Sequence, residues 1–476
     1  MINDEKSNWR NSLFITDSFL NPRSLGWPRG FFKDYDASFS PSLFYKFYCF
    51  CFTNSTTIDK IEVMAQEYKR WQIENTKKAL KNRRVVAISG ARQTGKTTLT
   101  KQVVSDNGTF RSLDNAALLQ AAKDDPNEFV KNPATDTMVI DEIQKAPQLM
   151  SEIKLAVDKD NRNGQYLVTG STNLRTIASL DDSLAGRIKH IRLRPLTVGE
   201  ILGKKPTFLE RAFTNNFPAQ IKGYDKDAIF DLAFRGGYPE VQRINDSKER
   251  KEWHKDYFDS LVKKDLIDIE KIRRVDAVRD LAKILAGWSG KYMDKSQIST
   301  TLEVSRPTLE IYSNALETLF IFERLSPWVK TDYDLVGKRP KIYITDTGLM
   351  ASLLNWKRED LVLDPDRSGK LMETFVFSEL AAQIDLDSDY SFYQYRDVKK
   401  RAIDFIVEKE NEGLLGIEVK AGRSVSKDDF APQIWFRDNV IKDKQQFKPI
   451  VLYSGEDVLS FGDGRLALPI AALWVE

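Results

Sequence analysis

An α/β fold with a parallel sheet and helices on both faces is predicted for residues 64–203 by three observations. Short apolar segments that suit buried strands alternate with stretches of helical length. A glycine-bordered loop directly follows the first strand, and two carboxylates end a later one. Because the carboxyl ends of parallel strands meet at one edge of a sheet, both features are expected at that edge.

The expected elements follow one another in a regular order. An amphipathic helix that begins at Met64 leads into the first strand, and apolar runs such as Val85–Ile88 mark the strands. Strands are expected near residues 84–89, 110–114, 137–141, 165–170 and 189–193. Helices are expected from residue 96, within 115–131, over 148–159 and near 173–180.

The loop after the first strand reads GARQTGKT, which matches the phosphate-loop (P-loop) pattern GxxxxGK[ST]. Its glycines let backbone amides turn toward phosphates, Lys96 can neutralise the outer phosphate oxygens, and the Thr97 hydroxyl can reach Mg²⁺. The motif predicts a P-loop NTPase sheet and a nucleoside triphosphate ligand. The expected binding residues are Gly90, Ala91, Arg92, Gln93, Thr94, Gly95, Lys96, Thr97 and Thr98.

The second motif is the strand Thr137–Ile140, which ends in Asp141 and Glu142. In phosphoryl transfer, one carboxylate holds the Mg²⁺ shell and a second can polarise the attacking water. We therefore expect Asp141, together with Thr97, on the metal side and Glu142 as the general base.

Two further positions are candidates for contact with the γ-phosphate. The strand over 165–170 runs into Ser171, Thr172 and Asn173, and the pattern does not decide which of these acts as the sensor; Ser171 is our first choice. Arg187 follows, as an arginine finger or an in-chain sensor. A surface salt bridge is the alternative for Arg187.

Composition limits the class of protein. The chain has 476 residues, which implies two to four domains, and its formal net charge is only +3, so contact with DNA would need a local basic patch. Its two cysteines, Cys49 and Cys51, form no disulfide framework, which fits a reducing cytoplasm. The longest apolar run is interrupted by Lys46 and is too short to span a bilayer. We expect a cytoplasmic protein without a membrane partner.

Residues 1–63 differ in composition from the rest of the chain, since they are rich in aromatics and breakers and show no sustained period. We expect an accessory, poorly ordered extension, and we hypothesise that biological translation starts at Met64. The alternative is an aromatic anchor for a membrane or a partner.

Six segments, in this order, resemble a known family: GARQTGKTTL, SLDNAALLQAAKDDP, MVIDEIQKAP, LVTGSTNL, SLAGRIKHIRLRPLTVGEIL and RGGYPE. Together they are similar to the prokaryotic AAA-type (AAA+) ATPases that carry a C-terminal domain of unknown function, over roughly residues 64–476. The resemblance implies an AAA+ core over 64–203 that uses ATP and Mg²⁺. It supports the roles given to Lys96, Thr97, Asp141 and Glu142, and it defines no cellular task.

Two segments follow the core. Residues 204–276 are expected to form a charged helical lid or connector, in which Arg235-Gly236-Gly237 marks a structural joint. Residues 277–345 suggest a winged helix, with Ser305 as the N-cap of the recognition helix. The tip of its wing is expected to be basic, with Lys330, Lys338, Arg339 and Lys341. Both duplex DNA and a protein stay open as its partner, because Glu303, Glu310 and Glu317 would face DNA poorly.

Residues 346–476 contain a second candidate site, on a hairpin of 401–407 and 414–420. A turn centred on Asn411 would set Asp404 opposite Glu418, with Lys420 on the same face. Such a set can hold Mg²⁺ for phosphodiester cleavage, and it resembles the PD-(D/E)XK nuclease fold, with Glu373 on the preceding helix as an extra ligand. Relatives usually have an acid where this chain has Ala402, so an active nuclease and a silent, salt-bridged fold both stay open.

The predicted function is ATP binding and hydrolysis, coupled by the C-terminal domains to DNA or a protein. One alternative is a Mg²⁺-dependent DNA nuclease gated by ATP, and another is a slow ATP-driven signalling switch. Self-association into a homo-oligomer is left open.

Overall fold

A computed structural model describes residues 68–476 apart from 105–107, 133–135, 175–183, 267–271, 273, 331–338, 442–446 and 476. The chain divides into two compact units, residues 1–62 and 63–476, and every described residue belongs to the second. The predictions for the extension over 1–63, for the start at Met64 and for most of the helix near 173–180 lie outside the described residues.

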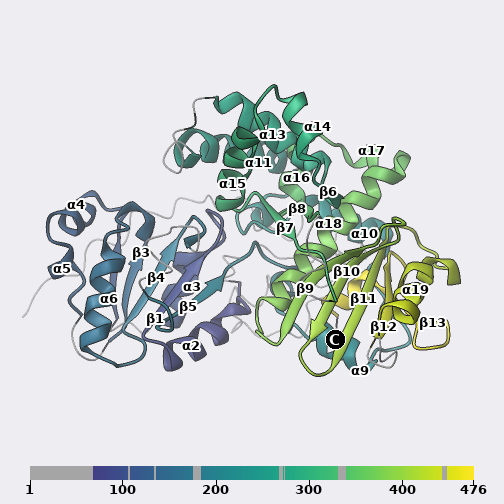
Figure 1. The fold of residues 1–476 in the computed structure, drawn as a ribbon, viewed down its shortest axis with the longest axis horizontal. Helices are drawn as coiled ribbons and strands as arrows, with labels where there is room; N and C mark the ends of the chain where they lie inside the picture. The colour runs from purple at the N-terminus through teal and green to yellow at the C-terminus, as the bar shows by residue number, and fades with distance from the viewer. Residues whose placement is uncertain are drawn as a thin grey trace, which may run out of the picture. The chain divides into compact units, whose positions relative to one another are not determined.

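Five parallel strands form the first sheet, in the order β2-β3-β4-β1-β5 (Figure 1). This result confirms the predicted parallel sheet of a P-loop NTPase. Since β4 lies between β1 and β3, the segments that follow these three strands leave the sheet side by side. The strands are β1 (Val85–Ser89), β2 (Thr109–Ser112), β3 (Met138–Asp141), β4 (Tyr166–Gly170) and β5 (Ile188–Arg192).

Alternating residues of β1 explain why helices cover both faces of this sheet. Val85 and Ala87 belong to the core that includes Ile153 and Val157 of α6, whereas Val86 and Ile88 pack in the core formed with α2 and α3. The expected helix from Met64 begins, in the described residues, at Gln72. The helical elements are α2 (Gln72–Asn82), α3 (Lys96–Val103), α4 (Ala116–Asp124), α5 (Pro126–Phe129), η2 (Ile143–Lys145) and α6 (Leu149–Lys159).

The elements that follow the first sheet are helical. The Gly236–Gly237 joint among them holds Asp346, because the Gly237 amide donates to Asp346 Oδ2 at 2.6 Å and a Cβ at Gly236 would lie 2.5 Å from Asp346 Oδ1. The elements are α8 (Val198–Ile201), α9 (Phe208–Thr214), α10 (Lys226–Arg235), η4 (Val241–Arg243), α11 (Ser247–Ser260) and the π-helical turn η5 (Leu261–Asp265).

The next segment is helix, strand, helix, helix, strand, strand, and its three strands form an antiparallel sheet in the order β6-β8-β7. Ser305 caps α15 by accepting the Thr308 amide, and Pro307 lies in the first turn, as the sequence predicts. Lys338 of the expected wing tip lies outside the described residues. Lys341, also expected at the tip, is instead the first residue of β8 and is buried, so its placement at an exposed tip was wrong. The elements are α13 (Val275–Gly287), β6 (Lys291–Tyr292), α14 (Lys295–Thr301), α15 (Arg306–Thr318), β7 (Phe322–Leu325) and β8 (Lys341–Ile344).

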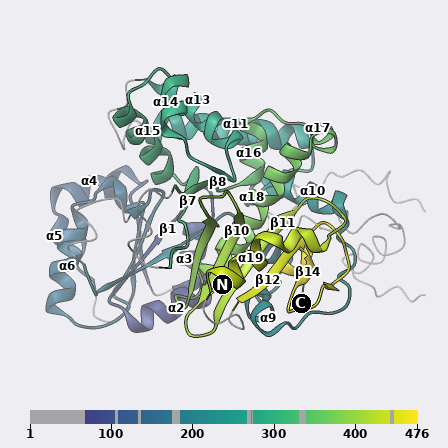
Figure 2. The ribbon, with the colours of Figure 1, turned by 45° about the vertical axis from the view of Figure 1, so that its right-hand side comes forward.

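The C-terminal part is a six-stranded mixed sheet in the order β13-β14-β12-β11-β10-β9 (Figure 2). Phe405 packs in the core that contains residues of α18, and its neighbour Ile406 packs with Phe436 of α19, so these helices cover opposite faces. The elements are α16 (Thr347–Leu353), α17 (Arg358–Leu363), α18 (Pro365–Ile384), β9 (Tyr390–Arg396), β10 (Ala402–Lys409), β11 (Gly413–Lys420), η7 (Lys427–Phe430), α19 (Ala431–Asn439), β12 (Phe447–Tyr453), β13 (Leu459–Ser460), β14 (Leu466–Pro469) and η9 (Ile470–Leu473).

The predicted register of the β10–β11 hairpin is confirmed. Phe405 pairs with Ile417, which sets Asp404 opposite Glu418, and Asn411 in the turn has a φ of 63°. Across the residues that the structure describes, no helix has both the length and the apolar character needed to cross a bilayer.

Candidate functional site

The P-loop leaves the carboxyl end of β1, whose five residues are all buried. Gly90 must be a glycine because an added Cβ would lie 2.1 Å from the carbonyl oxygen of Leu193. Gly95 has a φ of 91° and precedes α3, while Gln93 adopts a positive φ of 61°. The loop therefore turns sharply enough to point its backbone at the first turn of α3.

Lys96 spans the loop from the first turn of α3. Its Nζ donates to the carbonyl oxygens of Gly90 and Ala91, each at 3.0 Å, and the side chain is 4% exposed. Burial lowers the pKa of Lys96, whereas Glu142 and Asp141 act in the opposite direction. The ammonium group thus lies against the loop backbone, where the charges of Asp141 and Glu142 act on it.

Thr97 and Asp141 meet across the sheet edge, as predicted. The Thr97 hydroxyl donates to Asp141 Oδ2 at 3.0 Å, and the Thr169 hydroxyl donates to the other carboxylate oxygen. A hydroxyl and a carboxylate in contact offer the oxygen ligands that Mg²⁺ prefers beside phosphates. The residues present therefore fit a magnesium ion held by Thr97 and Asp141.

Glu142 has a left-handed backbone with a φ of 59°, and its amide donates to the Thr169 hydroxyl at 3.2 Å. Its carboxylate accepts a hydrogen bond from Nε2 of the Gln144 side chain, which also donates to Ser171 Oγ at 2.9 Å. Gln144 therefore links the predicted base to the predicted sensor. Thr172, the alternative sensor, is 7% exposed.

Sequence reasoning missed Gln144 and Thr169. Thr169 is a polar residue inside an otherwise apolar strand, and this local signal could have identified it. Gln144 follows the acid pair by two residues, which is too common an arrangement to single it out.

Two arginines hold the P-loop to other parts of the chain. Arg70 is 6% exposed, and it donates to the Thr94 carbonyl oxygen at 2.5 Å and to Glu200 at 3.0 Å. Arg92, one of the predicted binding residues, forms an ion pair with Asp265 of η5 at 2.8 Å. No local pattern marks Arg70 or Asp265, because each acts through a contact distant in sequence.

The remaining predicted loop residues differ in accessibility. Thr94 is buried, and its hydroxyl donates to the Ala91 carbonyl oxygen at 2.8 Å. Gln93 and Thr98 are exposed. The loop backbone, and not these two side chains, forms the floor of the site.

Arg187 is not brought to the P-loop. It directly precedes β5, and its Nε lies 2.6 Å from Asp158 Oδ1, while its carbonyl oxygen accepts the amide of Val85. Val85 begins β1, whereas the P-loop follows the end of that strand, so Arg187 lies at the opposite edge of the parallel sheet. This placement contradicts an in-chain sensor, agrees with the surface salt bridge, and leaves a contact with another protomer as the remaining catalytic alternative.

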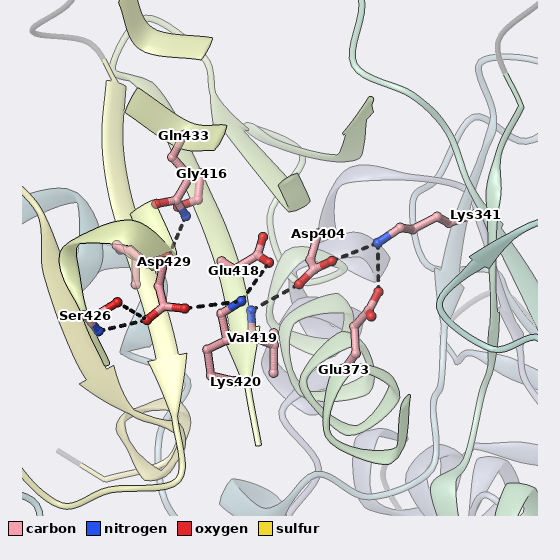
Figure 3. A network of polar contacts seen from close by, with 11 residues as sticks. Lys341, Glu373, Asp404, Gly416, Glu418, Val419, Lys420, Ser426, Asp429 and Gln433 are labelled. Carbon is pink, nitrogen blue, oxygen red and sulfur yellow. Dashed lines mark hydrogen bonds and ion pairs between the residues drawn. The ribbon is translucent and has the colours of Figure 1, made fainter. Parts of the chain in front are cut away.

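The predicted nuclease residues lie close together, with a lysine among them (Figure 3). Lys341 of β8 is buried, and its Nζ lies 2.9 Å from Glu373 Oε1 and 2.8 Å from Asp404 Oδ1. On the other side of Asp404, Oδ2 accepts the Val419 amide at 3.1 Å. The Tyr343 hydroxyl donates to Glu373 at 2.6 Å. We name Glu373, Asp404 and Glu418, with Lys341, the carboxylate cluster.

Burial dominates the electrostatics of the carboxylate cluster. It raises the pKa of Glu373 to about 7 and that of Glu418 to about 8, and the charge of Asp404 adds to both shifts. Burial opposes the charge of Lys341, but Asp404 and Glu373 together raise the pKa of this lysine well above its ordinary value. Lys341 therefore stays a cation, with two carboxylates as its partners.

Mg²⁺ does not fit the carboxylate cluster as the structure arranges it. The Lys341 ammonium occupies the position between Glu373 and Asp404 where a cation would bind, and Lys420 lies 3.4 Å from Glu418. Among the described residues, no group of three or more His, Cys, Asp or Glu side chains is arranged to hold a metal ion. The structure thus favours the silent, salt-bridged alternative over metal-dependent cleavage.

Buried charges also link the first sheet to the segments that follow. Arg194, just after β5, lies 2.6 Å from Glu323 of β7 and 2.6 Å from Asp385 at the end of α18, and Arg192 lies 2.8 Å from Glu323. Although burial opposes its charge, the two arginines lower the pKa of Glu323. After the carboxyl end of β4, the backbone amide of Asn173 donates to the carbonyl oxygen of Thr318, the last residue of α15, at 2.9 Å.

The comparison with protein families agrees with this geometry. Residues 82–202 match the family described as "AAA domain", so the chain contains an AAA-type ATPase domain of the P-loop class. Residues 226–360 and 368–473 match two families described as domains of unknown function, DUF8612 and DUF4143.

Similar proteins in other organisms extend over most of the chain. "Uncharacterized protein Mb2031c" of Mycobacterium bovis is 24% identical over 399 residues, which is 83% of this chain and 81% of that protein. "Uncharacterized protein MJ1544" of Methanocaldococcus jannaschii is 24% identical over 352 residues, which is 70% of this chain and 74% of that protein.

Solved structures with some similarity include two ATPases. The RuvB Holliday junction branch migration motor of Thermotoga maritima is 18% identical, covers 54% of this chain and 90% of its own, and has a TM-score of 0.25. AMPPCP-bound DnaA of Aquifex aeolicus is 14% identical, covers 52% of this chain and 85% of its own, and has the same TM-score.

Proposed function

We propose that this protein binds ATP with Mg²⁺ and hydrolyses it at the carboxyl edge of the β2-β3-β4-β1-β5 sheet. The observation that carries the proposal is the 3.0 Å contact between Thr97 and Asp141, beside Lys96 and Glu142. A hydroxyl, a carboxylate, a buried ammonium and a second carboxylate are the groups that phosphoryl transfer to water requires. The AAA-type domain over 82–202 supports the same assignment.

Each residue has a separate task in this mechanism. Lys96 neutralises phosphate oxygens, and the amides of the P-loop bind them by hydrogen bonds. Thr97 and Asp141 would hold Mg²⁺, which offsets the charge on the phosphates. Glu142 accepts the proton of the attacking water, and Gln144, which contacts both Glu142 and Ser171, orients the base relative to the γ-phosphate position.

Two substitutions test the proposal in the full-length chain. Lys96→Ala should abolish tight ATP binding, because the P-loop loses the ammonium group that neutralises the outer phosphate oxygens. Glu142→Gln should keep ATP binding while hydrolysis falls by about 100-fold or more, the usual contribution of a general base. Binding is measured by calorimetry and hydrolysis by phosphate release, with Lys123→Ala, an exposed lysine of α4, as the control.

Either of two results would contradict the proposal. If the Lys96→Ala protein binds ATP as tightly as the parent, the P-loop is not the ATP-binding site. If the Glu142→Gln protein hydrolyses ATP at the parent rate, Glu142 is not the general base, even if ATP still binds at the P-loop.

The finer part of the proposal concerns what ATP turnover drives. We propose that residues 275–344 are a winged helix, which the order α13-β6-α14-α15-β7-β8 and the sheet order β6-β8-β7 support. Glu310 and Glu317 of α15 would face DNA poorly if they were unpaired. Both form ion pairs with Arg324 of β7, at 3.3 Å and 2.9 Å, which reduces this objection to DNA. The Arg194–Glu323 pair and the Asn173–Thr318 hydrogen bond would carry changes at the nucleotide site to this segment.

A further inference from the structure

We propose that a cavity between β6, β8 and β9 binds a single strand of nucleic acid, with cations on its backbone phosphates and aromatic rings against its bases. The cavity has a volume of about 930 Å³ and is lined by residues of all three strands. This inference names a partner for the proposed function and rests on it for the role of that partner. The site itself involves no residue of the P-loop.

The cavity has fixed walls. Tyr292 of β6 donates its hydroxyl hydrogen to Gln394 Oε1 of β9 at 3.1 Å, and Gln394 Nε2 donates to the Arg339 carbonyl oxygen at 3.2 Å. Gln394 is 1% exposed, and its backbone forms a bridge with Pro327 beyond β7. A buried amide that contacts both walls holds them at a constant separation.

The cavity keeps unpaired positive charge when its ion pairs are left out of the count. Its two acids are each bound by an arginine, since Asp397 pairs with Arg401 and Asp294 lies 3.2 Å from Arg339. Lys291, Arg396 and Lys400 also line the cavity. Within the part of the chain that the structure describes, no carboxylate pairs with Arg396 or Lys400, and the Lys291–Asp366 contact is 3.5 Å long between exposed side chains.

Aromatic rings distinguish a nucleic-acid strand from an acidic peptide as the ligand. Trp288 and Tyr292 line the cavity, and the Arg396 guanidinium lies over the Tyr292 ring at 4.4 Å. Bases stack on aromatic and guanidinium planes, whereas an acidic peptide would use only the cations. Burial raises the pKa of Tyr292 to about 12, so its ring adds no negative charge at neutral pH.

Lys341 also lines the cavity. It is the residue whose ammonium group binds Glu373 and Asp404 (Figure 3). These two carboxylates would repel phosphates if they were unpaired. Lys341 pairs with both carboxylates, which reduces the repulsion that a strand bound nearby would meet.

The test measures the binding of fluorescent oligo(dT) to the full-length chain by anisotropy, without nucleotide, at several salt concentrations. Arg396→Ala/Lys400→Ala should weaken binding about 10-fold or more, and it should reduce the slope of log Kd against log salt by about 1.4, or about 0.7 for each lost phosphate contact on a single strand. Lys248→Ala/Lys255→Ala, which removes two exposed cations of α11, is the control and should change neither value.

Three results would overturn the inference: no binding of oligo(dT) at low salt, equal binding by the two double variants, or a polyglutamate peptide that binds the cavity while oligo(dT) does not. Duplex DNA bound as tightly as oligo(dT) would overturn the single-strand assignment. If the parent protein binds oligo(dT) but does not hydrolyse ATP, only the proposed function is refuted. The binding inference then stands, because the binding assay contains no nucleotide.

Discussion

Replacing Glu379 of α18 with glutamine tests how strongly burial controls protonation next to the ATPase domain. Glu379 is 3% exposed, and its Oε1 accepts the amide of Val198 at 2.9 Å. Its other oxygen has no hydrogen-bond partner among the described residues. Burial raises the pKa of Glu379 to about 8, the Val198 hydrogen bond opposes this shift, and Glu200 adds to it. The folded chain therefore holds this carboxyl group protonated at neutral pH.

The magnitude follows from the size of the shift. The pKa rises from 4.5 to about 8, which at about 1.4 kcal/mol per pKa unit corresponds to about 5 kcal/mol. Between these pH values the folded chain binds more protons than the unfolded chain, so the free energy of unfolding falls as the pH rises. Glutamine has no proton to lose. Glu379→Gln should therefore gain up to about 5 kcal/mol relative to the parent between pH 4.5 and pH 8.

The assay is urea unfolding of parent and variant at pH 5 and pH 8.5, followed by tryptophan fluorescence. Comparing the variant with the parent at each pH cancels the other titrating groups. Glu410→Gln, at an exposed turn, is the matched control for the substitution itself. Our reasoning would be refuted by an equal stability difference at both pH values, or by a glutamine variant that is less stable than the parent at pH 8.5.

Two further outcomes follow from buried contacts. Lys341→Met should destabilise the chain by about 3–5 kcal/mol at pH 8, because Glu373 and Asp404 lose their cation. The loss should shrink at pH 5, because burial and the charge of Asp404 raise the pKa of Glu373 to about 7, so Glu373 is protonated there. Thermal unfolding that shows the same loss at both pH values would contradict this account. Thr169→Val removes the hydroxyl that donates to Asp141 and should raise the Mg²⁺ concentration for half-maximal ATP hydrolysis about 10–100-fold. An unchanged Mg²⁺ requirement would show that Thr169 does not orient this carboxylate.

Local patterns were sufficient to predict that the P-loop and Asp141 meet at one edge of the sheet. The P-loop is contiguous, and Asp141 ends an apolar strand, so the parallel sheet alone brings Thr97 and Asp141 into contact. The hairpin register followed from alternation along two strands that are joined by a short turn, which placed Asp404 opposite Glu418. These predictions depended on contacts within one element or between neighbouring elements.

The residues that were missed or misplaced depend on contacts distant in sequence. Lys341 reaches Asp404 from a strand 63 positions earlier, and no period or motif announces that meeting. Arg187 is different, because the predicted strand over 189–193 already implied its position. A residue that precedes a parallel strand lies at the edge opposite the P-loop, and applying that rule would have excluded an in-chain sensor.

The main-chain bond between Asn173 and Thr318 has a consequence for how this protein can change during evolution. Both partners are backbone atoms, so replacing the side chains around them leaves the link in place, and only proline at position 173 would delete the donor. Ser171 is two residues away, and the intervening stretch is too short to absorb a shift by bending. The link between the segment after β4 and the last residue of α15 therefore does not depend on which side chains that helix presents to a partner.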